Sequence, residues 1–125
     1  MGRAKILVIE DEEGIRRLIA RILEDAYEVQ LASDGAEGLK LARWGAPGAI
    51  LLDLRMPGMD GLSVLAQLKA NTKTSAIPVI VVSAKGDTEM LLECQRAGAV
   101  DHVIKPFDAD SLRLVIQRNL STRKE

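Results

Sequence analysis

Short apolar runs alternate with amphipathic stretches five times along the chain. Continuous apolar runs bounded by charged or turn-forming residues are typical of strands that are covered on both faces. The runs that predict strands occupy residues 6–9, 27–32, 49–52, 79–82 and 100–104. Apolar residues that recur three and four positions apart predict helices over residues 36–43, 61–70 and 88–97, and two more that contain residues 15–23 and 112–120.

This alternation predicts an α/β fold with a single doubly wound, five-stranded parallel sheet and helices on both faces. Residues 27–32 are the more polar run, which suits a sheet edge, and residues 6–9 then lie centrally. The predicted strand order is 2-1-3-4-5, the flavodoxin-like order. A chain of 125 residues is long enough for one core. We expect one domain over residues 1–120 and a tail or the start of a linker over residues 121–125.

Glycine and aspartate residues mark the predicted loops and helix starts. Gly58 and Gly61 follow the third strand and are expected to supply positive φ or a close backbone approach. Aspartates that can accept hydrogen bonds from the first turn of a helix precede four of the helices. They are Asp34 (with Glu37 three residues later), Asp60, Asp87 and either Asp108 or Asp110.

Composition narrows the functional classes. The chain is 47% hydrophobic and 28% charged with a net charge of −1, and only 2% of it is aromatic. It therefore has no basic footprint and almost no aromatic surface for nucleic acid, and we expect no direct nucleic-acid binding. One cysteine excludes an internal disulfide and suits a reducing compartment. Without an apolar stretch of about 18 residues we expect no membrane insertion, and a cytoplasmic protein.

Acidic residues follow the ends of two strands that the predicted order places side by side. Asp53 ends the third strand, and Glu10 and Asp11 follow the first. Their carboxylates should converge in the crevice beyond the sheet, where mutual repulsion raises their pKa values unless a cation lies among them. Oxygen ligands without His or Cys favour a hard cation, and Mg²⁺ in particular. Lys105, at the end of the fifth strand, can supply a further positive charge.

Each of these residues also has an ordinary structural interpretation. A lone aspartate after a strand, such as Asp53, more often makes a turn or a cap. Glu12 and Glu13 are best explained as an acidic first turn that complements the helix dipole. Ser83 alone suits a strand end and Lys105 alone suits a solvated surface. Polar or ionisable residues at the ends of the first, third, fourth and fifth strands together favour a functional site.

Four sequence motifs carry a family resemblance. They are Glu10-Asp11, the DLRMPGMDG stretch from Asp53, the PVIVVSA stretch containing Ser83, and AGAVDHVIKPF containing Lys105-Pro106-Phe107. In this order and spacing the chain resembles a response-regulator receiver domain of two-component phosphorelay signalling, over nearly all of residues 4–120.

The resemblance implies a role for each matching residue. Asp53 would accept a phosphoryl group from the phosphohistidine of a sensor histidine kinase or a histidine phosphotransfer protein. Asp11, Asp53 and the backbone carbonyl of Arg55 would hold Mg²⁺, with Glu10 acting through a bound water. The protein would be a signalling phosphoacceptor with slow autodephosphorylation rather than an enzyme with a separate substrate.

The resemblance also implies a switch. Ser83 would donate its hydroxyl to the phosphoryl group beside Lys105, and the ring at His102 would follow it inward. The bond between Lys105 and Pro106 would be cis. The family usually has Tyr or Phe at the position of His102, so a histidine there indicates a weaker or pH-sensitive switch. An uninvolved histidine on an edge strand remains the alternative.

Two cations distinguish the site, Arg55 two residues after Asp53 and Lys85 two residues after Ser83. In the family these positions influence hydrolysis, and our hypothesis is that both side chains screen the attacking water and lengthen the phosphorylated lifetime. Partners would be the kinase, an output domain or target protein, and a second copy of the chain. Met90 and Leu114, on predicted helices with more apolar residues than one face can bury, are the candidate interface residues.

Other functional classes fit less well. An aspartate phosphohydrolase of the haloacid-dehalogenase type requires a second Asp where Arg55 stands. A flavin phosphate would be repelled by the acidic stretch 10–13. The only histidine falls on a predicted strand, which argues against a phosphohistidine carrier. A receiver-like module that binds partners without phosphorylation is the best alternative. Whether the chain acts alone or belongs to a longer regulator stays open.

Overall fold

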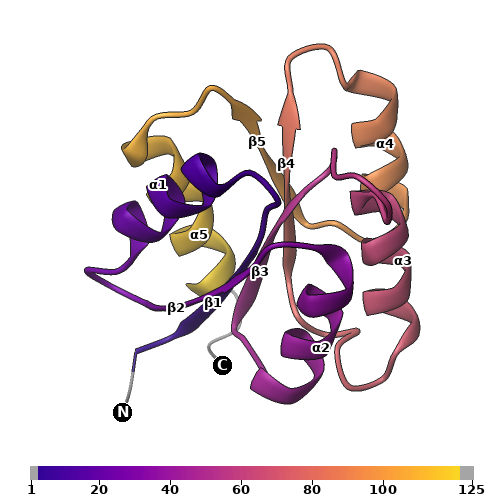
Figure 1. Ribbon diagram of the computed structural model, residues 1–125, viewed down its shortest axis with the longest axis horizontal. Helices are drawn as coiled ribbons and strands as arrows, with labels where there is room; N and C mark the ends of the chain where they lie inside the picture. Colours follow the sequence, from indigo (N-terminus) through magenta and orange to yellow (C-terminus); the bar gives the residue numbers. More distant parts are fainter. Residues whose placement is uncertain (1–2, 122–125) are drawn as a thin grey trace.

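The computed structural model describes residues 3–121 and shows one five-stranded parallel sheet with the order β2-β1-β3-β4-β5, as predicted (Figure 1). The strands are β1 (Lys5–Ile9), β2 (Glu28–Ala32), β3 (Ala49–Asp53), β4 (Val79–Ala84) and β5 (Asp101–Lys105). The helices are α1 (Glu13–Leu23), α2 (Gly35–Gly45), α3 (Gly61–Ala70), α4 (Thr88–Arg96) and α5 (Ala109–Ser121). Of the predicted tail, Ser121 belongs to α5, and residues 122–125 lie outside the described residues.

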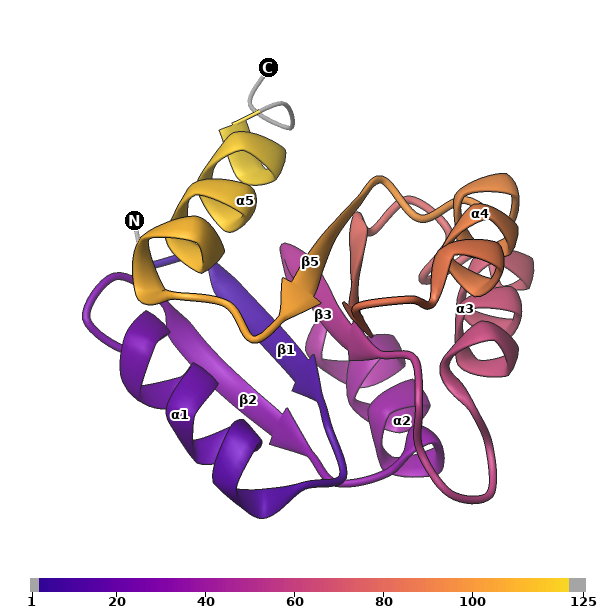
Figure 2. The ribbon, with the colours of Figure 1, turned by 90° about the horizontal axis from the view of Figure 1, so that it is seen from above.

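The helices cover both faces of the sheet (Figure 2). Side chains alternate along each strand, so the two faces carry separate apolar clusters. The cluster containing Leu7, Ile9 and Leu52 packs under α2, α3 and α4. The cluster containing Val8 and Leu51 packs under α1 and α5. All residues of β3 are buried, as expected for the central strand of a doubly wound sheet.

Several boundaries differ from the predicted ones by one or two residues. β2 begins at Glu28 rather than at residue 27, and β5 runs from Asp101 to Lys105 rather than over residues 100–104. Partner strands set these ends, because β5 pairing begins where Asp101 faces Ile80. α2 continues to Gly45, and the left-handed position after it is taken by Ala46, with φ 49°. Helix and strand ends depend on such partners more than on local pattern.

The loop after β3 is built by its two glycines in different ways. Gly58 has φ 79°, a left-handed conformation that favours glycine. At Gly61 a Cβ would lie 2.6 Å from the backbone oxygen of Asp53, so only a hydrogen fits there. Asp60 then caps α3 by accepting a hydrogen bond from Ser63 N at 2.9 Å. This loop holds the first turn of α3 against the end of β3.

Three of the predicted aspartate caps are present and one is not. Asp34 accepts from Glu37 N at 2.8 Å, and Asp108 rather than Asp110 accepts from Ser111 N at 2.8 Å. Asp87 precedes α4, but its side chain makes no cap to that helix. The predicted cap is therefore wrong, because the carboxylate of Asp87 instead contacts Arg55 and accepts a hydrogen bond from Ala84 N at the end of β4.

Candidate functional site

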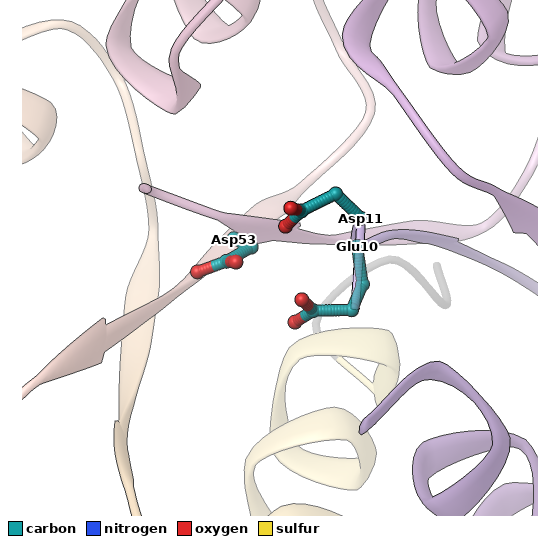
Figure 3. A group of neighbouring side chains, drawn as sticks. All are labelled: Glu10, Asp11 and Asp53. Atoms are coloured by element: carbon teal, nitrogen blue, oxygen red, sulfur yellow. The ribbon is translucent and has the colours of Figure 1, made fainter. Parts of the chain in front are cut away.

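Three carboxylates meet at the carboxyl ends of β1 and β3. The side chains of Glu10, Asp11 and Asp53 each offer an oxygen, and these oxygens lie within 4.8 Å of one another (Figure 3). Glu10 and Asp53 are buried, while Asp11 is exposed. β1 and β3 are neighbours in the sheet, which is why residues more than forty positions apart converge. The structure thus brings together the three acidic residues that the sequence predicted.

Lys105 completes the cluster from the end of β5. Its Nζ lies 3.5 Å from Asp53 Oδ1 and 3.6 Å from Glu10 Oε1. The Lys105 side chain is about a quarter exposed, at 27%, and therefore bridges the buried carboxylates and the solvent. One ammonium group faces two buried carboxylates, so the described side chains leave the cluster short of positive charge.

Glu10 bears most of this imbalance. The pKa of Glu10 is raised to about 7, mainly by burial and also by the charge of Asp53, while the hydrogen bond from the amide of Glu12 and the charge of Lys105 act in the opposite direction. Glu10 Oε2 accepts a hydrogen bond from Glu12 N at 3.1 Å. Glu10 Oε1 is buried without a hydrogen-bond partner among the described residues. A buried carboxylate oxygen without a donor is a favourable position for a cation.

This donor set fits a hard divalent cation. All the converging groups are carboxylate oxygens, the ligands that Mg²⁺ and Ca²⁺ prefer over the softer transition metals. The exposure of Asp11 leaves the cluster open on its solvent side, where waters or a phosphate could complete a coordination shell. Arg16 fixes the loop that carries two of these carboxylates, since its Nη1 donates to the backbone oxygens of Glu10 and Asp11 at 2.8 and 3.2 Å.

Ser83 and His102 lie on the two strands at the other side of Asp53. Asp53 faces Val82 across β3 and β4, and Ser83, buried next to it in β4, faces Ile104 in β5. His102 faces Val81 and is half-buried. Val81 and Ser83 are alternate residues of β4 and therefore share a face of the sheet. His102 faces Val81, so it lies on that same face, two residues closer to the amino ends of the strands than Ser83. The Lys105–Pro106 peptide bond is cis.

A salt bridge that the sequence did not predict crosses the mouth of the site. The guanidinium of Arg55 contacts the carboxylate of Asp87, with Nε 3.1 Å from Oδ1 and a closer contact from Nη2. Asp87 Oδ2 accepts from Ala84 N at 2.9 Å. The hydrogen bond to Arg55 lowers the pKa of Asp87, and the amide of Ala84 adds to this. Adjacency of β3 and β4 was the one available signal, since the loops after them must face each other.

The remaining predicted residues are distributed around this salt bridge. Arg55 N lies 3.4 Å from Asp53 Oδ1, so the Arg55 backbone touches the cluster while its side chain reaches away to Asp87. Lys85 is exposed on the loop after β4. Met90 is half-buried and packs against the core, whereas Leu114 is 56% exposed.

Comparison with known proteins finds one family. The profile of the response regulator receiver domain matches residues 6–117. The chain is 34% identical to sporulation initiation phosphotransferase F of Bacillus subtilis (strain 168), over 96% of each protein. It is 38% identical to the regulatory protein AtoC of Escherichia coli (strain K12), covering 97% of this chain but only 27% of that protein. The receiver domain of NtrX from Brucella abortus has a similar structure, with a TM-score of 0.88 and 38% identity over 94% of this chain and 98% of that one.

Proposed function

Because the chain belongs to the response regulator receiver domain family, we propose that it is a phosphoacceptor switch in which Asp53 takes a phosphoryl group from a histidine kinase with the help of Mg²⁺. The observation that carries the proposal is the convergence of Glu10, Asp11, Asp53 and Lys105 at the ends of three strands. Residues 1–120 would form the receiver domain, in the cytoplasm. No helix among residues 3–121 is both long and apolar enough to span a bilayer.

In this proposal Asp53 acts as the nucleophile. A carboxylate oxygen of Asp53 would attack the phosphorus of a phosphohistidine, forming a P–O bond as the P–N bond breaks and its electron pair returns to the imidazole ring. Glu10, Asp11, Asp53 and the backbone carbonyl of Arg55 would hold Mg²⁺, which supplies charge neutralisation for the phosphoryl oxygens. Lys105, already 3.5 Å from Asp53, would neutralise a further oxygen.

The signal would pass through β4 and β5. Ser83 would donate its hydroxyl to the phosphoryl group, and His102, on the same face of the neighbouring strand, would follow that movement. We expect the surface of α4, β5 and α5 to change its affinity for an output domain, a target protein or a second copy. Leu114 and Met90 are its candidate contacts. Amide hydrogen exchange of α4 and α5 that responds to neither phosphorylation nor partner would contradict this part of the proposal.

Hydrolysis of the phosphorylated state would be slowed by Arg55 and Lys85, whose cationic side chains would screen the attacking water. Arg55 Nε donates its hydrogen to both carboxylate oxygens of Asp87, at 3.1 and 3.3 Å, and this fixes the position of one of the two screening groups. Arg55→Ala combined with Lys85→Ala is expected to shorten the phosphorylated lifetime. An unchanged dephosphorylation rate in the double variant would remove the hypothesis.

Intact-mass spectrometry tests the phosphoacceptor directly. The protein is incubated with acetyl phosphate, either with Mg²⁺ or with EDTA. We expect a gain of one phosphoryl group only with Mg²⁺, absent in Asp53→Asn. Asp60→Asn is the matched control, because Asp60 lies in the loop after the same strand but only caps α3. No gain under any condition would leave a receiver-like module that binds partners without phosphorylation.

A further inference from the structure

The carboxyl-terminal halves of α2 and α3, with the loop that follows α3, form a positively charged surface. We call it the α2–α3 basic face and define it by Lys40, Arg43, Trp44, Lys73 and the pocket beside them. Neither residues 38–52 nor residues 61–78 contain an acidic residue, although the whole chain has a net charge of −1. The positive charge of this face is therefore a local concentration rather than a property of the whole protein.

Trp44 is the only tryptophan of the chain, and its side chain lies on this surface. It is 70% exposed and belongs to neither apolar cluster of the core. Lys73 Nζ lies 5.5 Å from the centre of the indole ring, a cation–π contact that leaves most of the ring in solvent. An exposed indole beside a cation is typical of a contact residue in a protein interface.

A pocket of about 500 Å³ opens beside Arg43. Leu39 and Leu68 supply its apolar wall, and Asn71 and Thr72 supply polar groups at the start of the loop. Thr74, which also lines the pocket, is buried with its hydroxyl donating to Leu68 O at 2.6 Å, so the loop is anchored to α3. An apolar wall with polar groups at the edge suits the side chain of a peptide.

The cations of this face are available to a ligand. Lys69, the nearest cation on α3, is occupied, because its Nζ donates to the backbone oxygens of Ser75 and Ile77, both at 3.0 Å. Lys40, Arg43 and Lys73 form no ion pair within residues 3–121. A surface with uncompensated positive charge attracts acidic ligands and steers their association.

We propose that the α2–α3 basic face binds an acidic segment of a partner protein, with an apolar side chain of that segment in the pocket or against Trp44. A peptide fits this face better than nucleic acid does. Proteins that bind single strands use a long basic groove and several aromatic side chains, whereas this face has one indole and one compact pocket. α2 and α3 run back from the carboxyl ends of the strands, so this face lies at the end of the sheet opposite Asp53. Binding is therefore independent of phosphorylation.

Selection from a phage-displayed library of random twelve-residue peptides on the whole chain tests the proposal. We expect enriched peptides to combine Asp or Glu with Leu or Phe. A synthetic enriched peptide without tryptophan should shift the fluorescence of Trp44, and its Kd should rise with salt concentration. The triple variant Lys40→Glu, Arg43→Glu, Lys73→Glu should weaken binding by at least about tenfold.

A second triple variant controls for net charge. Arg21→Glu, Arg96→Glu and Arg113→Glu reverse exposed cations on α1, α4 and α5 and should leave the Kd within about twofold. Circular dichroism verifies that both variants are folded. Asp53→Asn should bind the peptide with the Kd of the parent. Failure of the peptide-binding proposal is therefore distinguishable from failure of the phosphoacceptor proposal.

Three results would overturn the proposal. One is selection that yields no acidic peptide. Another is an equal loss of binding in both triple variants. The third is tight binding of a single-stranded oligonucleotide, measured by anisotropy, that the acidic peptide does not compete away, since this would identify nucleic acid as the occupant.

Discussion

Replacing Glu10 by Gln tests the electrostatics of the carboxylate cluster without metal. The raised pKa of Glu10, about 7 against an ordinary value of 4.5, means that the folded state holds this proton more tightly than the unfolded chain does. The resulting stability is fully present below pH 4.5 and is lost as the pH rises through 7. The glutamine side chain of the variant does not ionise, and its amide can still accept from Glu12 N and donate toward Asp53.

The expected magnitude follows from the difference between the two pKa values. A difference of about 2.5 corresponds to about 3.4 kcal/mol at about 1.36 kcal/mol per pKa unit. Because the charges of Asp53 and Lys105 both act on Glu10, we expect a measured effect of about 2 kcal/mol. At pH 8 in EDTA the Glu10→Gln variant should be more stable than the parent by about that amount, and near pH 4.5 the two should converge.

Urea unfolding from pH 4.5 to pH 8 measures the effect. Glu12→Gln is the matched control, because Glu12 is an exposed acid in the same loop. It should keep the pH dependence of the parent. Mg²⁺ at about ten times its Kd should stabilise the parent by about 1.4 kcal/mol at pH 8 and should stabilise Glu10→Gln less. A variant whose stability falls with pH as steeply as that of the parent would refute the reasoning.

Three further predictions concern the fold. Gly61→Ala should lower the free energy of unfolding, measured in urea, by about 2–3 kcal/mol, because the added Cβ would lie 2.6 Å from backbone at the end of β3. Gly14→Ala is the control: its Cβ would have nothing within 4 Å, so it should be neutral or stabilising by up to about 1 kcal/mol. Cys94 is fully buried and burial raises its pKa to about 11, so Ellman's reagent should react with it only in denaturant. Asp101→Ala should cost about 1–3 kcal/mol by removing a partner of Arg118. Burial raises the pKa of Asp101, but hydrogen bonds from α5 lower it to about 2, so its contribution should decline as the pH falls from about 4 through about 2. A difference in unfolding free energy between variant and parent that is as large at pH 2 as at pH 7 would contradict the last expectation.

The order of elements could be predicted from the sequence because burial is periodic. The continuous apolar run before Asp53 predicts a strand covered on both faces, and all five residues of β3 are buried. Element ends were less predictable. Whether Val100 or Asp101 begins β5 depends on which residue faces Ile80, and that register is set by the neighbouring strand.

The acidic cluster could also be predicted, because parallel strands end at one edge of the sheet. Because β1 and β3 are neighbours, the acidic residues at their ends approach one another whatever path the following loops take; these residues are Glu10, Asp11 and Asp53. The sequence could not say that Glu10 rather than Asp11 would be the buried member. That difference follows from how the first residues after β1 turn toward α1.

Local pattern alone therefore determined the class of fold, the order of its strands and the group of residues at their ends, because these follow from hydrophobic periodicity and strand direction. Only the tertiary structure decided which side chains meet between loops. Asp87 satisfies every local rule for a helix cap, yet its carboxylate contacts Arg55 and Ala84 N. Lys73 lies over Trp44 because α2 and α3 pack side by side. Such contacts depend on long-range register and on the free energy of competing partners, which no single stretch of sequence contains.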